Sequence, residues 1–500
     1  TPLVCTTNVG EGNTESGTTS AFVAGISSQA TNNYSTAVGT LSCATGSSSS
    51  VFGRYTCATA QNSSAFGRSS KATGYNDVAL GFCAITSEYA GATDKCPRYN
   101  ISIGSWTLAC NGMCCDTTTD YDYPSIAIGH RSCSTVCGGL TVGTCTQSTG
   151  MLSSSFGNCS CATGNCSTAV GSRSCSTGTS SIAIGYDSCG ASSQAIAIGH
   201  QAKSTWQQAT SIGYTACSIN SYATALGYGA KGTGTQSIAL GLFSCTVGAC
   251  STALGRSAYA YGSKSTSVGI ASCSIGLCAG AFGYTALATG NYSTAVGFHT
   301  CTTVSHSSAF GLQSCATGSY STAVGFQSCS TGTQSSAFGK TSCATGSYSV
   351  AIGRSSCSTA SVSTAVGNYS CATGSNSSAF GYYSCATADD SLAIGRSTCA
   401  EGVNSSSIGN FAIARIACTV NISQPLIHKK DSGETAGGDF TQFSSAESTL
   451  MTKEIDLKTT ACHTITIPTG ATFFINEAGV ISTCVDTLTT QATFKIGCAT

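Results

Sequence analysis

Small and apolar residues alternate along most of this chain in two short phrases that follow one another at a fixed distance. The phrases read S-(S/T/I)-A-(V/F/I/L)-G and S-C-(A/S)-T-G, as in "SAFGLQSCATGSYSTAVGFQSCSTG" at 308–332. Alternation with a period of two is typical of β-strands, whose side chains point in turn to opposite faces. Glycine at the end of each phrase predicts a corner. Each fourteen-residue unit therefore predicts two short strands and two turns.

The fixed period is stronger evidence for the architecture than any single motif. The glycine that closes the first phrase recurs about 27 times, at Gly25, Gly39, Gly53, Gly67, Gly81, Gly104 and Gly129, and then every fourteen residues to Gly409. A unit this short cannot hold a helix pair, and it buries its inner face only by stacking on its neighbours. We therefore expect an all-β fold whose main part is a parallel β-solenoid.

The period also predicts the domain organisation. The solenoid shaft is expected over 20–412, after an N-terminal connector at 1–19 and before a β-rich C-terminal domain at 413–500. Two units between Gly81 and Gly129 are enlarged, so loops are expected to protrude within 82–128. Because loops vary without disturbing a stack, a binding site is expected in the loops near Trp106 or in the C-terminal domain.

Two stretches of the repeat resemble a known family. "SIAIGYDSCGASSQAIAIGH" (181–200) and "SVAIGRSSCSTA" (349–360) are similar to the head repeat of trimeric autotransporter adhesins, a fourteen-residue S-V-A-I-G-x-x-S-x-A unit. The resemblance covers 20 to about 412 and implies a left-handed parallel β-roll in a tight homotrimer. The chain departs from the family in two ways. The family's heads are not rich in cysteine, and its neck, coiled-coil stalk and membrane barrel are not seen in this sequence.

The C-terminal region resembles another kind of protein. The stretch "HTITIPTGATFFINEAGVISTCVDTLTTQATFKIG" at 463–497 reads as alternating strands. It is similar to a β-rich domain of tail-fibre and surface-fibre proteins from phages and large DNA viruses, with the phrases T-I-P-x-G-A-x-F-F and F-x-I-G. The resemblance implies a small β-sandwich-like domain that continues beyond Thr500, and a fibre on a virion or another appendage.

Composition narrows the setting in which the chain works. Only 8% of the residues are charged and the formal net charge is zero, so the composition does not indicate a basic surface that would bind nucleic acid. No apolar run approaches the roughly 20 residues that span a bilayer, so direct membrane insertion is not expected. The 33 cysteines favour an oxidising extracellular setting.

Seventeen units carry a cysteine four residues after the corner glycine, and we call this set the cysteine column. Equivalent residues of neighbouring coils stand about 4.8 Å apart, and a disulfide accepts Cα separations of roughly 4.4 to 6.8 Å. Column neighbours are therefore predicted to bond as Cys43–Cys57, Cys175–Cys189, Cys301–Cys315, Cys329–Cys343, Cys357–Cys371 and Cys385–Cys399. Further candidate pairs are Cys133–Cys137, Cys145–Cys159, Cys161–Cys166, Cys245–Cys250 and Cys273–Cys278.

The column has two alternative interpretations. Cysteine is also a small hydrophobic residue suited to a narrow core, and the bonds could instead join different chains of a trimer. Bonds within a chain would each close a loop of about fourteen residues, worth roughly 3 kcal/mol, and would resist fraying of the stack. The odd number of cysteines leaves one thiol without a partner in the chain, and Cys217 has no obvious partner.

Other chemistry finds less support in the sequence. N-x-S/T sequons make Asn33, Asn62, Asn100, Asn291 and Asn376 glycosylation candidates. A column of single threonines resembles ice-binding solenoids, but a strand-favouring residue beside a turn explains it as well. The six histidines lie in no catalytic motif, carboxylates are sparse in the repeats, and Cys114-Cys115 lacks metal-ligand spacing. No catalytic site, metal or cofactor is predicted.

The sequence thus predicts a structural, homotrimeric fibre without enzymatic activity, stiffened by disulfides and placed on a virion surface. It would attach the particle to a host receptor or glycan. The alternative is a cellular extracellular adhesin or a self-assembling surface filament. A third and weaker interpretation is an ice-binding or glycan-binding solenoid.

Overall fold

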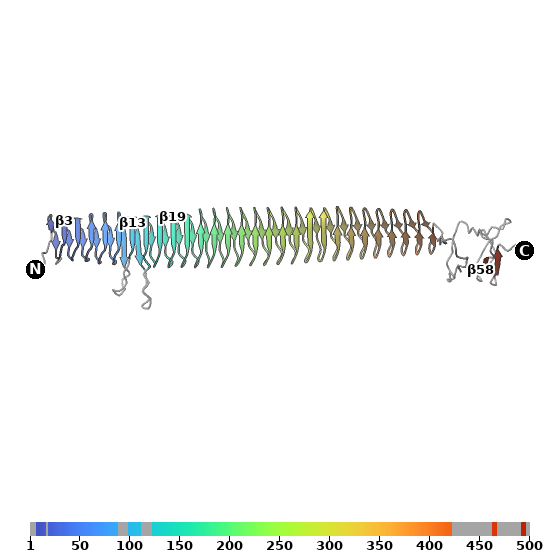
Figure 1. Cartoon of the computed structure of the whole chain (residues 1–500), viewed down its shortest axis with the longest axis horizontal. Helices are drawn as coiled ribbons and strands as arrows, with labels where there is room; N and C mark the ends of the chain where they lie inside the picture. Colours follow the sequence, from blue (N-terminus) through green and yellow to red (C-terminus); the bar gives the residue numbers. More distant parts are fainter. Residues whose placement is uncertain are drawn as a thin grey trace, which may run out of the picture. The chain divides into compact units, whose positions relative to one another are not determined.

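The computed structural model describes residues 7–16, 19–88, 99–111, 123–422, 463–467 and 492–496. The described residues between 7 and 422 form a stack of about 28 coils, each contributing one strand to each of two parallel sheets (Figure 1). Sheet A holds the odd-numbered strands from β1 (Thr7–Val9) to β57 (Val420–Ile422), and sheet B the even-numbered strands from β2 (Thr14–Glu15) to β56 (Ile413–Ala414). The described residues contain no helix. The predicted parallel β-solenoid is confirmed.

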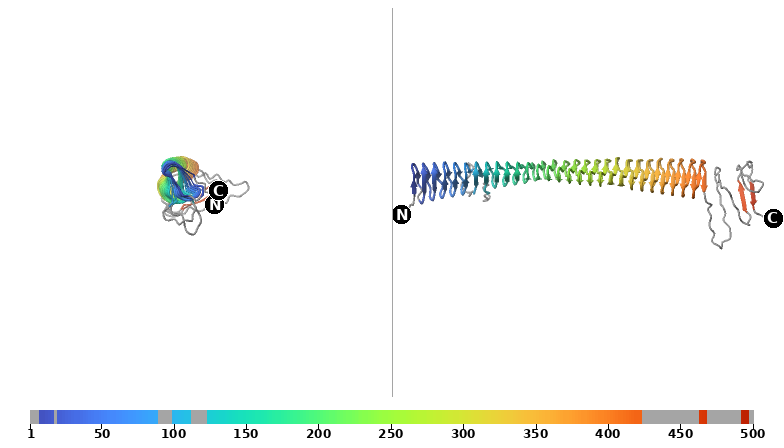
Figure 2. Two further views of the ribbon diagram at one scale, coloured as in Figure 1. Left: turned by 90° about the vertical axis from the view of Figure 1, so that its left-hand side faces the viewer. Right: turned by 90° about the horizontal axis from the view of Figure 1, so that it is seen from above.

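Each strand pairs in register with the equivalent strand of the next coil. On sheet A, β41 (Ser308–Leu312) pairs with β43 (Thr322–Val324), and Ala309 lies opposite Ala323. On sheet B, β40 (Cys301–Thr302) pairs with β42 (Cys315–Ala316). The strands run across the axis of the stack, and the coils overlie one another along it (Figure 2). At about 4.8 Å per step, the stack is roughly 130 Å long.

The interior of the shaft is filled by very small side chains. From β3 to β56 the second residue of each sheet A and sheet B strand points inward, as Ala309 and Ala316 do with no exposed surface. Alanine, serine and threonine occupy nearly all of these positions, and Val23 and Val51 are the exceptions of greater volume. One coil therefore buries little apolar surface, so its stability depends on its neighbours in the stack.

Buried serines close the corners of many coils. Ser321 Oγ donates to the carbonyl of Gly318 at 2.6 Å in one corner, and Ser342 Oγ donates to the carbonyl of Gly339 at 3.3 Å in the other. Equivalent bonds recur at many corners and satisfy hydroxyls that would otherwise be costly to bury. Other buried corner serines, such as Ser314 and Ser349, have no hydrogen-bond partner for their hydroxyls among the described residues. The serine that begins each phrase is thus a corner residue whose side chain faces the core.

The two phrase-ending glycines have different reasons to be glycine. Gly325 has φ +135°, and a Cβ there would lie 2.2 Å from the carbonyl oxygen of Gly339 in the next coil. At Gly318 a Cβ would lie 2.0 Å from the Gly332 carbonyl oxygen, although Gly318 is not in the left-handed region. Tyr320, with φ 57°, is the left-handed residue of that corner. The prediction that glycine supplies both corner conformations is therefore wrong for the second phrase, where glycine permits close approach.

The ladder of coils is longer than the range 20–412. It includes β1, where a connector was expected, because β1 pairs with β3 (Phe22–Ile26). It continues to β57, which pairs with β55 (Ser406–Ile408). These outer coils depart from the repeated phrase but still place their residues in register with the neighbouring strands. Residues 89–98 and 112–122, within the 82–128 region predicted to carry protruding loops, lie outside the described residues.

The chain divides into two compact units, 1–434 and 435–500. In the second unit the described residues are β58 (His463–Ile467) and β59 (Ala492–Ile496), which pair antiparallel. Of the range 413–500 predicted for the β-sandwich-like domain, 413–422 belong to the shaft, and apart from β58 and β59 the remaining residues lie outside the described residues. Within the described ranges, no helix has the length and apolar character needed to cross a membrane.

Candidate functional site

The cysteine column lies on the outer face of sheet B. The first residue of each sheet B strand points away from the core, and the column cysteines occupy that position with partly buried side chains. Register pairs them directly, as with Cys43 and Cys57. An unbroken series of eight runs through Cys301, Cys315, Cys329, Cys343, Cys357, Cys371, Cys385 and Cys399.

Neighbouring thiols of this series contact one another. A hydrogen bond from Cys315 lowers the pKa of Cys301 to about 7, against the effect of partial burial. Thiol hydrogen bonds also join Cys329 to Cys343 and continue coil by coil to Cys399. Between Cys315 and Cys329 the interaction is only electrostatic. Hydrogen bonds also join Cys343 to Cys357 and Cys371 to Cys385, which belong to different predicted pairs, so these contacts do not by themselves select the bonding partners.

The same local arrangement begins two other cysteine runs. A hydrogen bond from Cys57 lowers the pKa of Cys43 to about 7, and one from Cys175 does the same for Cys161. In each run the second thiol stabilises the thiolate of the first. The thiolate is the nucleophile in thiol–disulfide exchange, so these positions favour disulfide formation near neutral pH.

The described column cysteines are thiols in this structure. Their Cα spacing suits a disulfide, but Cβ atoms in a flat parallel ladder keep the strand spacing of about 4.8 Å. A disulfide prefers Cβ atoms roughly 3.5 to 4.5 Å apart, so each bond would require two coils to approach slightly at this face. The column pairs stay predictions.

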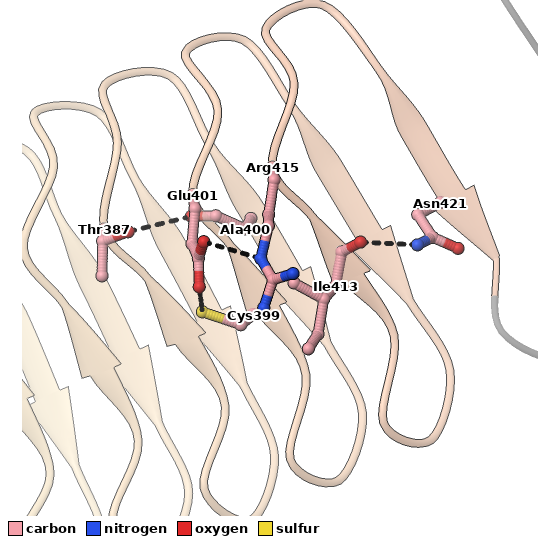
Figure 3. Close-up of polar contacts among 7 residues, drawn as sticks. All are labelled: Thr387, Cys399, Ala400, Glu401, Ile413, Arg415 and Asn421. Atoms are coloured by element: carbon pink, nitrogen blue, oxygen red, sulfur yellow. Dashed lines mark hydrogen bonds and ion pairs between the residues drawn. The ribbon is translucent and has the colours of Figure 1, made fainter. Parts of the chain in front are cut away.

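The C-terminal end of the column is bounded by an ion pair (Figure 3). Cys399 Sγ donates to Glu401 Oε1 at 3.4 Å, and Arg415 Nε lies 3.3 Å from Glu401 Oε2. Partial burial, and then the Glu401 carboxylate, raise the pKa of Cys399. The next column position is Ile413, so the last cysteine has a cysteine neighbour on one side only.

In the middle of the shaft the column changes character. Between Cys189 and Cys301 no two cysteines are neighbours, because the column reads Lys203, Cys217, Lys231, Cys245, Tyr259, Cys273 and Leu287. Burial raises the pKa of Cys217, and the two flanking lysines oppose that shift. The register leaves these cysteines without a bonding neighbour in the column.

The predicted Cys133–Cys137 bond is not formed in this structure. Cys133 is a thiol on the outer face of sheet B, in β16 (Cys133–Ser134). Cys137 lies in the following corner, is 3% exposed and is disulfide-bonded. Its partner is not among the other described cysteines, which are all thiols. Sequence spacing suggested the pair, but the strand directs Cys133 outward while Cys137 bonds elsewhere.

The remaining pairs outside the column involve corner residues. Cys145 and Cys159 occupy the same corner of neighbouring coils, with φ 55° and 53°. The pairs Cys161–Cys166, Cys245–Cys250 and Cys273–Cys278 would each join the outer face of sheet B to the following corner. Cys250 Sγ instead lies 3.3 Å from Gln236 Oε1 of the preceding coil. These four pairs stay predictions.

The outer face of sheet A carries a continuous apolar stripe, which we define as the residue directly before each corner glycine. From Val38 to Ile408 this residue is always valine, isoleucine, leucine or phenylalanine. Phe310 and Ile352, for example, point outward and remain 38% and 40% exposed. An exposed apolar patch on a typical monomer measures a few hundred Å², whereas this stripe adds a side chain in every coil. It therefore marks an interaction surface.

Aromatic side chains stack along one corner of the shaft, and we call this set the aromatic ladder. Tyr186, His200, Tyr214 and Tyr228 occupy successive coils, and their ring centroids are 5.0, 4.7 and 4.8 Å apart. The Arg173 guanidinium caps the ladder, 5.5 Å from the Tyr186 ring centroid. The ladder forms no short motif, but its fourteen-residue spacing is present in the sequence.

Several residues of the threonine column form bonds between coils. The hydroxyls of Thr177, Thr233 and Thr289 donate to backbone carbonyls of the next coil at 3.0, 2.6 and 3.1 Å. These bonds reinforce the stack and use the donors that an ice-binding array would present to water. The three threonines thus have a structural role in the shaft.

The sequon asparagines differ in accessibility. Asn62, Asn291 and Asn376 are exposed, and Asn33 is partly exposed. Asn100 is fully buried, and its Oδ1 accepts from the Ser125 backbone at 3.0 Å, so its side chain cannot receive a glycan in the folded shaft. The structure therefore argues against the Asn100 candidate, while glycosylation of the other four stays a prediction.

Sequence reasoning missed two groups of residues. Asp77 and Asn100 replace the usual corner serine where the enlarged coils begin, and Asp77 accepts from the Gly74 and Asn100 backbones at 2.9 and 3.0 Å. Three glutamines also contact cysteines of the next coil, namely Gln29, Gln147 and Gln236. Both groups keep the fourteen-residue register or its enlarged form, which is the signal that could have revealed them. The described residues contain no cluster of three or more metal-ligating side chains.

The repeat matches a known family model. Ten stretches of the shaft match the YadA head domain repeat, at 19–42, 58–82, 162–188, 219–244, 281–300, 305–328, 330–356, 363–384, 372–398 and 386–412. No curated protein matches the chain. The matches lie on both sides of the enlarged coils and extend almost to the end of the described shaft.

Proposed function

We propose that the shaft works as a homotrimeric attachment rod on a virion surface. The shaft carries YadA head domain repeats, which make it an adhesin-like structural solenoid fibre. The proposed self-association rests on the apolar stripe on the outer face of sheet A. YadA-like adhesins are surface-exposed homotrimers that bind host surfaces. Two further copies of this chain are therefore the proposed partners that cover the stripe.

The stripe suits a like partner better than a small ligand. It repeats every coil along the shaft, so only an equally long and periodic surface covers all of it. Each coil adds a Phe, Leu, Ile or Val side chain, and burying apolar area is worth about 25 cal/mol per Å². Such a contact supplies the stabilisation that the small alanine and serine core lacks.

Trimerisation through sheet A also favours disulfides within one chain. The stripe and the cysteine column lie on the outer faces of different sheets, with the buried alanines between them. A trimer that buries the stripe would therefore hold the cysteine columns of its three chains apart. Column neighbours of one chain would then bond in the oxidised fibre and stiffen the rod. The disulfide at Cys137 supports an oxidising setting for the chain.

The virion location rests on the C-terminal resemblance to viral fibre domains. The proposed β-sandwich-like domain, which would follow β57 of the shaft, would carry an attachment or receptor-binding function, with a host protein or glycan as its ligand. The alternative is a cellular extracellular adhesin or surface filament, which the repeat supports equally. Antibodies against the shaft would label intact virions under the first proposal, and they would label cells in the absence of virus under the second.

The trimer is tested by placing charge on the stripe. We expect the double variant Phe310→Lys and Phe338→Lys to sediment as a monomer, because two ammonium groups per chain would have to be buried at the contact. The matched control is Tyr320→Lys and Tyr348→Lys, which changes exposed corner residues of the same part of the shaft. A stripe variant that remains the same oligomer as the wild type would contradict the proposed interface.

A further inference from the structure

Three glutamine side chains lie against cysteine thiols one coil further along the chain. The Sγ–Oε1 distances are 3.3 Å for Cys250 and Gln236, 3.8 Å for Cys161 and Gln147, and 3.9 Å for Cys43 and Gln29. In all three pairs the glutamine precedes the cysteine by fourteen residues. The shaft thus repeatedly places a thiol nucleophile beside a carboxamide carbonyl.

The pair of Gln236 and Cys250 differs from the other two in its surroundings. Cys43 and Cys161 each have another cysteine on their far side, at Cys57 and Cys175, with which they can form a disulfide. Cys250 has the shortest contact, and the equivalent residue of the next coil is Lys264. The chemistry proposed here uses the same thiol as the predicted Cys245–Cys250 disulfide and is the alternative to that bond.

The order along this corner is therefore carboxamide, thiol and amine, in three successive coils. Cys250 and Lys264 are both exposed, so neither group has to be uncovered before it reacts. Cys250 N donates to the Thr235 carbonyl, and Lys264 N donates to the Ala249 carbonyl, each at 2.8 Å. The backbone ladder thus holds the three residues in line.

We propose that Gln236, Cys250 and Lys264 form a self-processing cross-link in which Cys250 takes the acyl group of Gln236 and passes it to Lys264. In the first step Cys250 Sγ bonds to Cδ of Gln236, and the bond from Cδ to Nε2 breaks. The thiol proton leaves with that nitrogen as ammonia, and a thioester joins the two coils.

In the second step the uncharged amine of Lys264 attacks the thioester. Its Nζ bonds to Cδ of Gln236, the bond from Cδ to Sγ breaks, and one amine proton goes to the sulfur. The products are an isopeptide bond between Gln236 and Lys264 and a restored Cys250 thiol. One amide has replaced another and one ammonia has been lost, so the sequence of steps needs no oxidant or reductant.

Proximity makes these steps reasonable on a rigid scaffold. Groups held in contact react with effective molarities that reach ~10⁵ M or more, and the released ammonia is diluted into the solvent. The cross-link joins residues two coils apart, about 10 Å between their Cα atoms, which extended glutamine and lysine side chains can span together. The staple would lie in the middle of the shaft, where neighbouring column cysteines are absent.

The test is the mass of the purified full chain after complete reduction, followed by peptide mapping. We expect the chain to weigh one ammonia less than its sequence, a branched peptide joining Gln236 to Lys264, and a Cys250 thiol that can be alkylated. Cys250→Ser should have the full mass of its own sequence. The matched control is Cys278→Ser, because Cys278 is exposed at the same corner with φ 53° but follows Lys264 and not a glutamine. This control should keep the cross-link.

Lys264→Arg separates the two steps. We expect this variant to stop at the thioester, so Cys250 resists alkylation until hydroxylamine releases it. Wild-type chain with an intact Gln236 carboxamide and no loss of ammonia would overturn the proposal. A thioester in the wild type together with an unmodified Lys264 would overturn the assignment of the acceptor. Circular dichroism of each variant confirms that the β-solenoid is intact before the masses are compared.

Discussion

Two sections of the shaft have the same backbone conformation but differ in the side-chain interactions that connect their coils. In the cysteine section, defined as the coils of Cys301 to Cys399, every column position is a cysteine. In the interrupted section, defined as the coils of Lys203 to Leu287, cysteine alternates with lysine, tyrosine or leucine. Both sections have the same two-residue sheet B strands and the same fully buried small residues. The fold is thus set by the inner residues, and the outer column adds a separate layer of interactions.

The interrupted section is not simply a weaker copy of the cysteine section. Its first coils carry most of the aromatic ladder, in which His200, Tyr214 and Tyr228 stack at centroid distances of 4.7 and 4.8 Å. The proposed staple from Gln236 to Lys264 lies in the same section. Coils without neighbouring cysteines are therefore connected by other side-chain interactions. The two sections should respond differently to a reductant.

Reduction should produce the largest difference between the sections. Four column disulfides would each contribute about 3 kcal/mol by restricting the unfolded chain. We expect a phosphine reductant to speed proteolysis and hydrogen exchange much more in the cysteine section than in the interrupted section, whose only candidate bonds are Cys273–Cys278 and, as the alternative to the proposed staple, Cys245–Cys250. Hydrogen exchange measured by mass spectrometry, with and without the reductant, reports both sections in one sample. Equal acceleration in both sections would contradict the account.

Corner glycines should be equally sensitive in both sections. Gly325→Ala and Gly227→Ala each place a Cβ within 2.2 or 2.5 Å of a carbonyl oxygen of the next coil, at φ +135° or +131°. We expect each substitution to destabilise the shaft by roughly 3 kcal/mol, because strain and clash combine. Thermal unfolding under reducing conditions measures this, with the partly exposed Thr317→Ala as control. A large difference between the two glycine variants would show that the backbone is not equivalent in the two sections.

A single substitution should extend the cysteine pattern into the interrupted section. Lys231→Cys places three cysteines in register, because Lys231 lies between Cys217 and Cys245. We expect one new disulfide and a gain of about 3 kcal/mol in local stability, which reduction removes. Lys231→Ser is the matched control for loss of the ammonium group. If all three thiols of the oxidised variant can still be alkylated, the column geometry does not support bonding.

The aromatic ladder should make a smaller contribution. Tyr214→Leu removes two ring stacks, and such aromatic pairs contribute about 1 kcal/mol each beyond their burial. We expect faster hydrogen exchange in the neighbouring coils and little change near Cys301. Tyr222→Leu is the control, since this exposed tyrosine has Gln208 and Gln236 at the equivalent positions of the adjacent coils. Equal effects from both substitutions would mean that stacking adds nothing to the ladder.

Thiol reactivity should distinguish the sections in the reduced chain. The pKa of Cys301 is lowered to about 7 by its hydrogen bond from Cys315, whereas burial raises the pKa of Cys217. A lower pKa means more thiolate at a given pH, and the thiolate is the reactive form. Near neutral pH, iodoacetamide should therefore modify Cys301 faster than Cys217. Cys315→Ala should slow the modification of Cys301, and an unchanged rate would contradict the role of Cys315.

The fold was predictable from the sequence because its period is simple. The alternation around Ala309 and Ala323 predicts an inward face, and the fourteen-residue spacing places equivalent residues in register. The corner chemistry was less accessible. Non-glycine residues such as Tyr320 adopt left-handed conformations because backbone bonds to the preceding coil hold them, as in the bond from Tyr320 N to the Ser305 carbonyl. Such a tertiary constraint leaves no mark in local propensity.

The candidate functional site was only partly predictable, because the burial and the contacts of its side chains depend on neighbouring coils. Spacing identified which cysteines share a column, but it did not tell which cysteines outside the column are buried. Cys137 is 3% exposed, although the equivalent residue of the next coil, Met151, is 47% exposed. Asn100 matches a sequon, but its position belongs to the buried corner serines. The Gln236–Cys250 contact depends on side-chain conformations in neighbouring coils, which a pattern of single residues does not specify.

The central claim is that coils of the cysteine section are covalently tied within one chain. The most direct measurement is disulfide mapping of the native fibre by mass spectrometry after digestion without reduction. The account predicts peptides that join Cys301 to Cys315, Cys329 to Cys343, Cys357 to Cys371 and Cys385 to Cys399, and a monomeric chain on a denaturing non-reducing gel. Free thiols throughout this series, or bonds that join different chains, would contradict it.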